Sequence, residues 1–156
     1  MSTYPAELYH YTNYESFLNI IRMGRILKAP SCLYMQKKLT LIFNPLTQHY
    51  EYADLEHDHI KRVVWLTDSR NAEGHGLYEK SHELRITIRA NSDYKYWLKW
   101  QKDNHMNKQM FRNLTKGTNY NSWWISENEI PVSDIVLVEE VKTGKVIYSS
   151  DKLRIA

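Results

Sequence analysis

The segment that most constrains the fold is the stretch of residues 8–26, which predicts a short strand followed at once by a capped helix. His10 comes close to the end of that strand. Thr12 and Glu15 have the spacing of a capping box, in which side chains satisfy two backbone donors at the start of a helix. Gly24 is the expected end of the helix. Four residues between Glu15 and Gly24 are expected to form an apolar face at helical spacing: Phe17, Leu18, Ile20 and Ile21. A buried strand that ends in polar and aromatic residues is typical of a functional site.

The length and composition predict one globular domain. At 156 residues the chain is long enough for one ordinary core and too short for two, so we expect a single domain over residues 1–156. Hydrophobic residues make up 42% and charged residues 25%, which excludes a disordered chain. The net charge of +3 permits contact with nucleic acid without requiring it.

The sequence also favours a cytoplasmic location. Its single cysteine, Cys32, excludes an internal disulfide and fits a reducing compartment. The first residues lack the basic and apolar regions of a secretory signal. No stretch approaches the roughly 18 apolar residues of a membrane span. We therefore expect a cytoplasmic domain that does not contact a membrane.

The order of expected elements indicates the α+β class. After the first strand and helix, alternation predicts strands at 62–67 and 83–89, and a helix is expected over 92–104. Three more strands are expected in the last third, at 122–129, 134–141 and 146–149. Helices that interrupt the early strands, with strands clustered late, are typical of an α+β domain.

Polar side chains occur on three of the expected strands, where a purely structural strand does not need them. The first is the segment 9–12. The second is Val64-Trp-Leu-Thr67, followed by residues 74–78. In the third, an extended chain over 123–131 would place Glu127 and Glu129 on the same face as Trp123 and Ile125. Pro131 is expected to end that strand.

Each of these residues alone also has a plain structural interpretation. A single histidine is more often a hydrogen-bonded structural residue, Thr67 favours a strand, and glutamates at a sheet edge discourage aggregation. Their joint order is more specific. A strand with His10, a helix, a Trp-Leu-Thr strand and a late Glu-x-Glu strand together resemble the ADP-ribosyltransferase superfamily, particularly its small toxin-like members from bacteria and phages.

The resemblance implies a compact domain with a central mixed, split β-sheet and flanking helices. It implies an NAD-dependent mono-ADP-ribosyltransferase, which transfers ADP-ribose to a macromolecular acceptor and releases nicotinamide. In that family's arrangement, His10 would bind a ribose hydroxyl of the adenosine half of NAD, with Thr12 assisting. Thr67 would shape the nicotinamide pocket. Tyr78 would stack on the nicotinamide ring, with Tyr11 as the alternative.

The resemblance also implies a catalytic carboxylate that stabilises positive charge on the nicotinamide ribose. The spacing of a glutamate four residues before Pro131 favours Glu127. The family's Glu-x-Glu convention, in which the second carboxylate is catalytic and the first orients the acceptor, favours Glu129. We rank Glu127 first and Glu129 as the alternate.

The acceptor is left open by two departures from the family's patterns. The second motif has no Ser-Thr-Ser run, which does not favour an arginine-modifying toxin, and no strong Gly-Tyr signature of the polymerase-like branch is present. A protein side chain, a nucleic-acid base or terminal phosphate, and water all fit the sequence.

Other classes of function compete with this one. A cluster of His49 with residues 56–59 could hold zinc, but its spacing matches no established motif, and a solvated loop is the simpler interpretation. The lysines and aromatics of residues 94–102 could bind single-stranded nucleic acid, although an amphipathic helix that packs its aromatics explains them more simply. A phosphate-transferring relative would use Arg85 and Arg89. A non-catalytic binding module or inhibitor predicts that His10 and the two glutamates do not converge.

Overall fold

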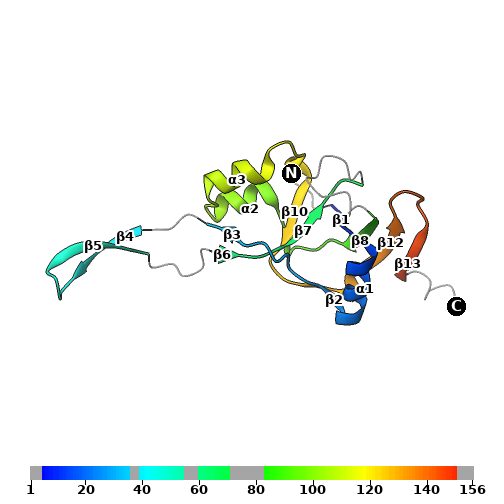
Figure 1. Cartoon of the computed structure of the whole chain (residues 1–156), viewed down its shortest axis with the longest axis horizontal. Helices are drawn as coiled ribbons and strands as arrows, with labels where there is room; N and C mark the ends of the chain where they lie inside the picture. Colours follow the sequence, from blue (N-terminus) through cyan, green and yellow to red (C-terminus); the bar gives the residue numbers. More distant parts are fainter. Residues whose placement is uncertain (1–4, 36–38, 55–59, 71–82, 151–156) are drawn as a thin grey trace.

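A seven-stranded sheet organises the part of the chain that the computed structural model describes, residues 5–35, 39–54, 60–70 and 83–150. Its strand order is β13-β12-β8-β1-β7-β10-β9 (Figure 1). Each pairing among these strands is antiparallel, so the expected α+β class is confirmed and the expected mixed sheet is wrong. The strands span β1 (Glu7–Thr12), β7 (Val64–Thr67), β8 (Leu84–Arg89), β9 (Tyr94–Tyr96), β10 (Trp123–Ser126), β12 (Ile135–Glu140) and β13 (Val146–Ser149).

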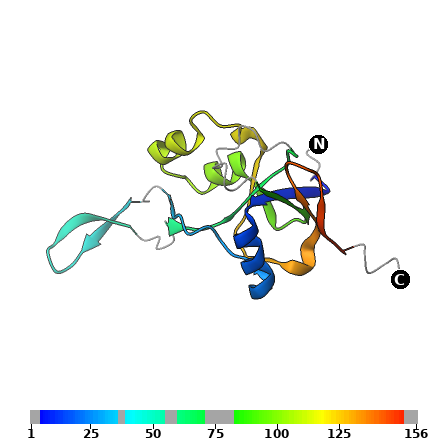
Figure 2. The same ribbon diagram turned by 45° about the vertical axis from the view of Figure 1, so that its right-hand side comes forward.

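Helices cover the sheet through two separate apolar clusters. Helix α1 (Tyr14–Met23) inserts Phe17 and Ile20 into a cluster built mainly from the centre of the sheet. Helices α2 (Trp97–Asp103) and α3 (Lys108–Thr115) lie next to each other and away from α1 (Figure 2). Their residues belong to a second cluster, which is rich in tryptophan. Successive side chains of β7 point to opposite faces of the sheet. Val64 and Leu66 therefore belong to the first cluster, whereas Trp65 packs against the second. The sheet is therefore buried on both faces around β7.

The start of α1 lies one residue later than the capping-box prediction. The N-cap is Asn13, whose side chain accepts a hydrogen bond from Ser16 N at 2.7 Å, while Thr12 stays in β1 opposite Leu84. Gly24 ends the helix as predicted: its φ is +77°, a value that favours glycine, and its N–H donates to Ile20 O at 2.8 Å.

The expected apolar face of α1 is only half correct. Phe17 and Ile20 are buried, but Leu18 is 62% exposed and Ile21 is 46% exposed. The buried face of α1 is therefore narrower than the apolar face that the sequence predicts.

The aromatic and lysine-rich segment divides into an edge strand and a helix. Residues 94–96 form β9, and α2 begins only at Trp97, so the expected helix over 92–104 is wrong before residue 97. Trp97 and Trp100 are buried, whereas Lys99 and Lys102 are exposed. The amphipathic interpretation of this segment is thus confirmed for its two tryptophans.

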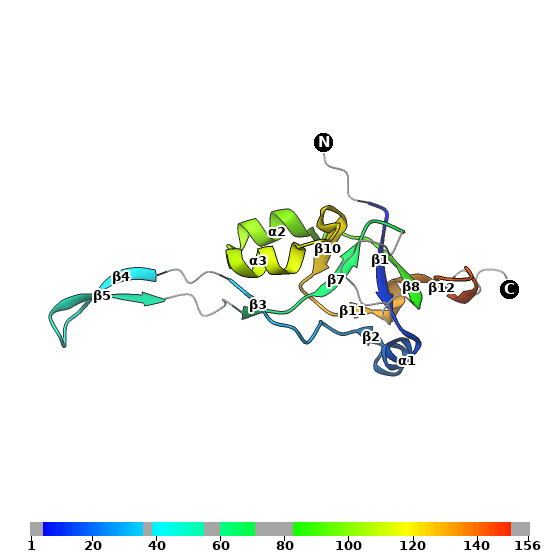
Figure 3. The same ribbon diagram turned by 45° about the horizontal axis from the view of Figure 1, so that its top comes forward.

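Short pairings connect the remaining segments. β2 (Arg25–Ile26) pairs with β11 (Ile130–Pro131), and β3 (Leu33–Tyr34) pairs with β6 (Ile60–Lys61). β4 (Leu39–Asn44) and β5 (His49–Asp54) form a hairpin of their own, which extends away from the main sheet (Figure 3). Two 3-10 turns, η2 (Tyr120–Ser122) and η3 (Val132–Asp134), flank β10 and β11. Within the described residues, no helix is long and apolar enough to cross a membrane.

Candidate functional site

The main sheet opens between β1 and β7. These neighbours share a single register pair, Tyr9 with Thr67, whereas β1 and β8 are paired along the whole of β1. Beyond that pair, a side chain takes the place of a backbone hydrogen bond: His10 Nδ1 lies 2.9 Å from the carbonyl oxygen of Trp65. The opening therefore begins at the residues that the sequence singled out on both strands.

The hydrogen bond to Trp65 determines the form of the imidazole. A carbonyl oxygen can only accept, so Nδ1 carries the proton and donates it. Burial lowers the pKa of His10 below its ordinary value of 6.5, an effect larger than the opposing effect of the Trp65 hydrogen bond. The ring is therefore neutral near pH 7, and its Nε2 is a hydrogen-bond acceptor.

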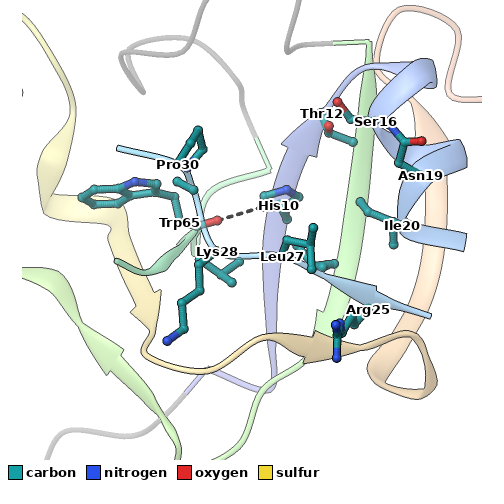
Figure 4. Close-up of a pocket in the computed structure, with 13 residues that line it drawn as sticks. His10, Thr12, Ser16, Asn19, Ile20, Arg25, Leu27, Lys28, Pro30 and Trp65 are labelled. Atoms are coloured by element: carbon teal, nitrogen blue, oxygen red, sulfur yellow. Dashed lines mark hydrogen bonds between the residues drawn. The ribbon is translucent and has the colours of Figure 1, made fainter. Parts of the chain in front are cut away.

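A cavity of about 370 Å³ lies on the α1 side of His10, and we call it the α1 cavity. Thr12 of β1 and the helix residues Ser16 and Asn19 line one side of it (Figure 4). Arg25 and Lys28, two exposed cationic residues from the segment after α1, also line it. This cavity thus combines hydroxyl and amide groups with positive charge.

A second cavity of about 290 Å³ lies toward α3, and we call it the α3 cavity. Its wall is mostly apolar and aromatic, and includes Tyr9, Tyr11, Trp123 and the helix residue Met110. His10 and Trp65 line both cavities, so the two cavities are neighbours at this pair.

Two polar groups of the α3 cavity, those of Thr67 and Tyr11, are engaged with the protein. Thr67 Oγ1 donates to Ser122 Oγ at 3.1 Å and accepts from Ser69 N at 3.1 Å. The Tyr11 hydroxyl donates to Ser69 O at 3.2 Å, and burial raises the pKa of this phenol. Thr67 therefore lines the α3 cavity, and its hydroxyl fixes the backbone at Ser69, directly after β7.

The two glutamates do not extend β10 as predicted. The strand ends at Ser126, whose hydroxyl donates to Asn128 O at 2.7 Å and accepts from Asn128 N at 3.2 Å. This local turn breaks the alternation, so Glu127 and Glu129 do not share a face with Ile125. Pro131 does not end β10 either, because it belongs to β11. The expected strand over 122–129 is thus wrong after residue 126.

The turn sends the two carboxylates to different surroundings. Glu127 is exposed, accepts a hydrogen bond from Trp100 Nε1 at 2.8 Å, and lines a separate cavity of about 750 Å³. Glu129 Oε1 lies 3.4 Å from Arg25 Nε, and Arg25 lines the α1 cavity. Only Glu129 is therefore linked to the cavities around His10.

The predicted residues converge in part. His10 and Thr12 line the α1 cavity, Tyr11 and Thr67 line the α3 cavity, and Glu127 lies apart from both. Tyr78 lies outside the described residues. Four polar residues that line the α1 cavity were not predicted from the sequence: Ser16, Asn19, Arg25 and Lys28. All four lie on the helix that follows the strand of His10 or directly after that helix, and this position is the feature that could have indicated them.

The alternative metal cluster finds no support among the residues that can be placed. His49 is exposed in β5, and residues 56–59 lie outside the described ranges. In those ranges, no group of three histidine, cysteine or acidic side chains is arranged to hold a metal ion.

Comparisons of the chain with protein-family models, with curated proteins and with solved structures found no match.

Proposed function

We propose that this chain is an NAD-dependent mono-ADP-ribosyltransferase that acts on a macromolecular acceptor, a protein or a nucleic acid. The observation that supports this most is the neutral His10, held by Trp65 where the main sheet opens between two cavities. An acceptor nitrogen fixed in this way suits a ribose hydroxyl, which can donate to it.

The two cavities suit different parts of a dinucleotide. The polar α1 cavity offers hydroxyl and amide groups for a ribose, and the cations Arg25 and Lys28 for a pyrophosphate. The aromatic α3 cavity offers flat walls for a planar ring, with Trp65 and Trp123 among them. Each cavity is near the lower end of the usual ligand-pocket range of about 300–1,000 Å³. One half of NAD in each cavity, with His10 between them, is the arrangement we propose.

The proposed reaction breaks the bond between the ribose C1′ and the nicotinamide nitrogen. Nicotinamide leaves as a neutral molecule with the electron pair of that bond, and positive charge develops on the ribose. A lone pair of the acceptor forms the new bond to C1′, and the acceptor loses its proton to solvent or to a nearby base. A carboxylate close to the ribose lowers the barrier by stabilising the developing charge.

We assign the carboxylate role to Glu129. Its ion pair with Arg25 ties it to the α1 cavity, whereas Glu127 is bound to Trp100 in the separate cavity. The Arg25–Glu129 pair has side chains that are 50% and 36% exposed, so solvent screens it and a ligand can replace it at small cost. This assignment reverses the ranking that the proline spacing favoured.

A non-catalytic binding module is the second candidate. The separation of Glu127 from His10 favours it, because convergence of both glutamates on the histidine was the expectation for the enzyme. This module would bind its partner without recognising NAD.

Thermal unfolding with and without NAD distinguishes the two. A ligand that binds only the native state stabilises it by about 2.7 kcal/mol at one hundred times its Kd. We expect NAD to raise the Tm of the wild type and of the control His49→Asn, which changes an exposed histidine far from the site. His10→Asn keeps a donor for Trp65 but loses the Nε2 acceptor, and should reduce the shift. No Tm shift at millimolar NAD, together with no transfer of labelled ADP-ribose to cell extract, would favour the binding module.

A further inference from the structure

The hairpin of β4 and β5, residues 39–54, which we call the arm, has one apolar face and one polar face. Leu41 pairs with Tyr52, and Phe43 pairs with Tyr50, so these four side chains lie on the same face. The Phe43 and Tyr50 rings contact each other, with centroids 5.3 Å apart. The opposite face carries Ile42 beside Glu51, and Asn44 beside His49.

The apolar face of the arm consists of Leu41, Phe43, Tyr50 and Tyr52, and all four side chains are exposed. Leu41 and Phe43 are both 52% exposed, and the two tyrosines are 69% and 71% exposed. The arm extends away from the main sheet in all three views (Figures 1–3). Each hydrogen bond formed by its described residues stays inside the arm. An isolated two-stranded hairpin is marginally stable in water, so a cover for this face would stabilise it.

The charge of the arm restricts what can cover it. Residues 39–54 contain no lysine or arginine, and they include the acids Glu51 and Asp54. Nucleic acids and anionic membranes are held mainly by cations, and residues 39–54 themselves supply none. The four side chains Leu41, Phe43, Tyr50 and Tyr52 are uncharged, so packing them against the same four residues of a second copy places no charge among these residues.

We propose that the apolar face of the arm is an interface with a second copy of this chain, in which two arms pack face to face about a two-fold axis. A two-fold interface uses the same patch on both copies, and a closed dimer is the commonest soluble assembly. An aromatic ring buries roughly 150–250 Å² when it goes from full exposure to full burial, so three rings and a leucine that are 52–71% exposed offer at most about 500 Å². Two copies therefore bury at most about 1,000 Å², the lower limit for a specific interface. The dimer is accordingly expected to be weak, and the inference does not depend on the proposed activity.

Two adjacent residues of β4 give a matched test. Leu41→Lys puts a charge on the apolar face, whereas Ile42→Lys puts the same charge on the polar face beside Glu51, where it is favourable. Sedimentation velocity of the full chain, up to about 100 μM, measures the dimer over the micromolar range. We expect wild type and Ile42→Lys to dimerise with concentration, and Leu41→Lys to stay monomeric. A wild type that is monomeric throughout, or a Leu41→Lys variant that dimerises as well as wild type, would overturn the proposal.

Crosslinking supplies a second readout that does not require the variants to be equally stable. Single cysteines at Leu41 or at Ile42 are made in a Cys32→Ser background and treated with a short thiol crosslinker. Covalent dimer from Leu41→Cys and little from Ile42→Cys is the expected result. Equal yields from both, or none from either, would contradict a face-to-face arrangement.

Discussion

The pH dependence of stability tests the neutral state of His10 without any ligand. Burial lowers the pKa of this imidazole below 6.5, the value it returns to when the chain unfolds. Below pH 6.5 the unfolded chain therefore binds a proton that the native chain does not, and the free energy of unfolding falls. The largest possible slope for one group is about 1.4 kcal/mol per pH unit. Above pH 6.5 the group is neutral in both states and contributes no pH dependence.

His10→Asn isolates this effect. The amide nitrogen of asparagine can take the place of Nδ1 and donate to Trp65 O, but it does not titrate. Urea unfolding followed by tryptophan fluorescence, between about pH 5 and pH 7.5, gives the free energy for both proteins. Other titrating groups cancel in the difference. One such group is Glu140, whose pKa is lowered below 4.5 by hydrogen bonds from Thr143 and then Tyr14. Its contribution to stability is therefore lost only below pH 4.5, outside the measured pH range.

The difference between the two proteins should be constant above pH 6.5 and should shrink steadily as the pH falls below it. The Asn variant will be less stable at pH 7.5, because a smaller side chain leaves a space between β1 and β7. Parallel pH profiles for wild type and His10→Asn would refute the assignment of a neutral imidazole.

Two further predictions concern buried polar groups of the main sheet. Thr87 is 2% exposed, and its hydroxyl is buried without a hydrogen-bond partner. Thr87→Val should therefore stabilise the chain by about 1 kcal/mol, or about 2–4 °C in Tm. A lower Tm in scanning calorimetry would contradict this prediction. Arg85 Nη2 lies 3.1 Å from Glu139 Oε1, with both side chains 12% exposed, so Glu139→Gln should cost about 2–3 kcal/mol by leaving a buried cation without its counter-charge. The exposed pair of Lys99 and Asp103 is its control, since Asp103→Asn should cost less than about 1 kcal/mol in the same urea titration.

The sequence predicted the parts of the fold that depend on local chemistry. Gly24 ends α1 because its backbone requires a positive φ, and a glycine after an apolar helical pattern indicates this directly. The strand with His10, and the strand that ends at Thr67, were both found from their residues, and they are neighbours in the sheet.

The errors arose where tertiary contacts decided between local alternatives. Thr12 and Asn13 are both good N-caps, and the pairing of Thr12 with Leu84 keeps it in β1, which leaves the cap to Asn13. Ser126 closes a turn with Asn128, and alternation alone does not reveal that such a side chain ends a strand. The exposure of Leu18 depends on which elements reach α1, and the helical pattern holds no information about that.

The release of nicotinamide from NAD tests the central claim most directly. It is measured for wild type, Glu129→Gln and Glu127→Gln, with cell extract as the source of acceptor. Loss of one electrostatic stabiliser of a transition state costs about 10²–10³ in rate. Glu129→Gln should therefore release nicotinamide slower than wild type by at least that factor, whereas Glu127→Gln should keep most of the wild-type rate. Both variants should retain the wild-type Tm closely, because each removes a contact at an exposed or half-exposed carboxylate. No release by the wild type, or full release by Glu129→Gln, would contradict the account.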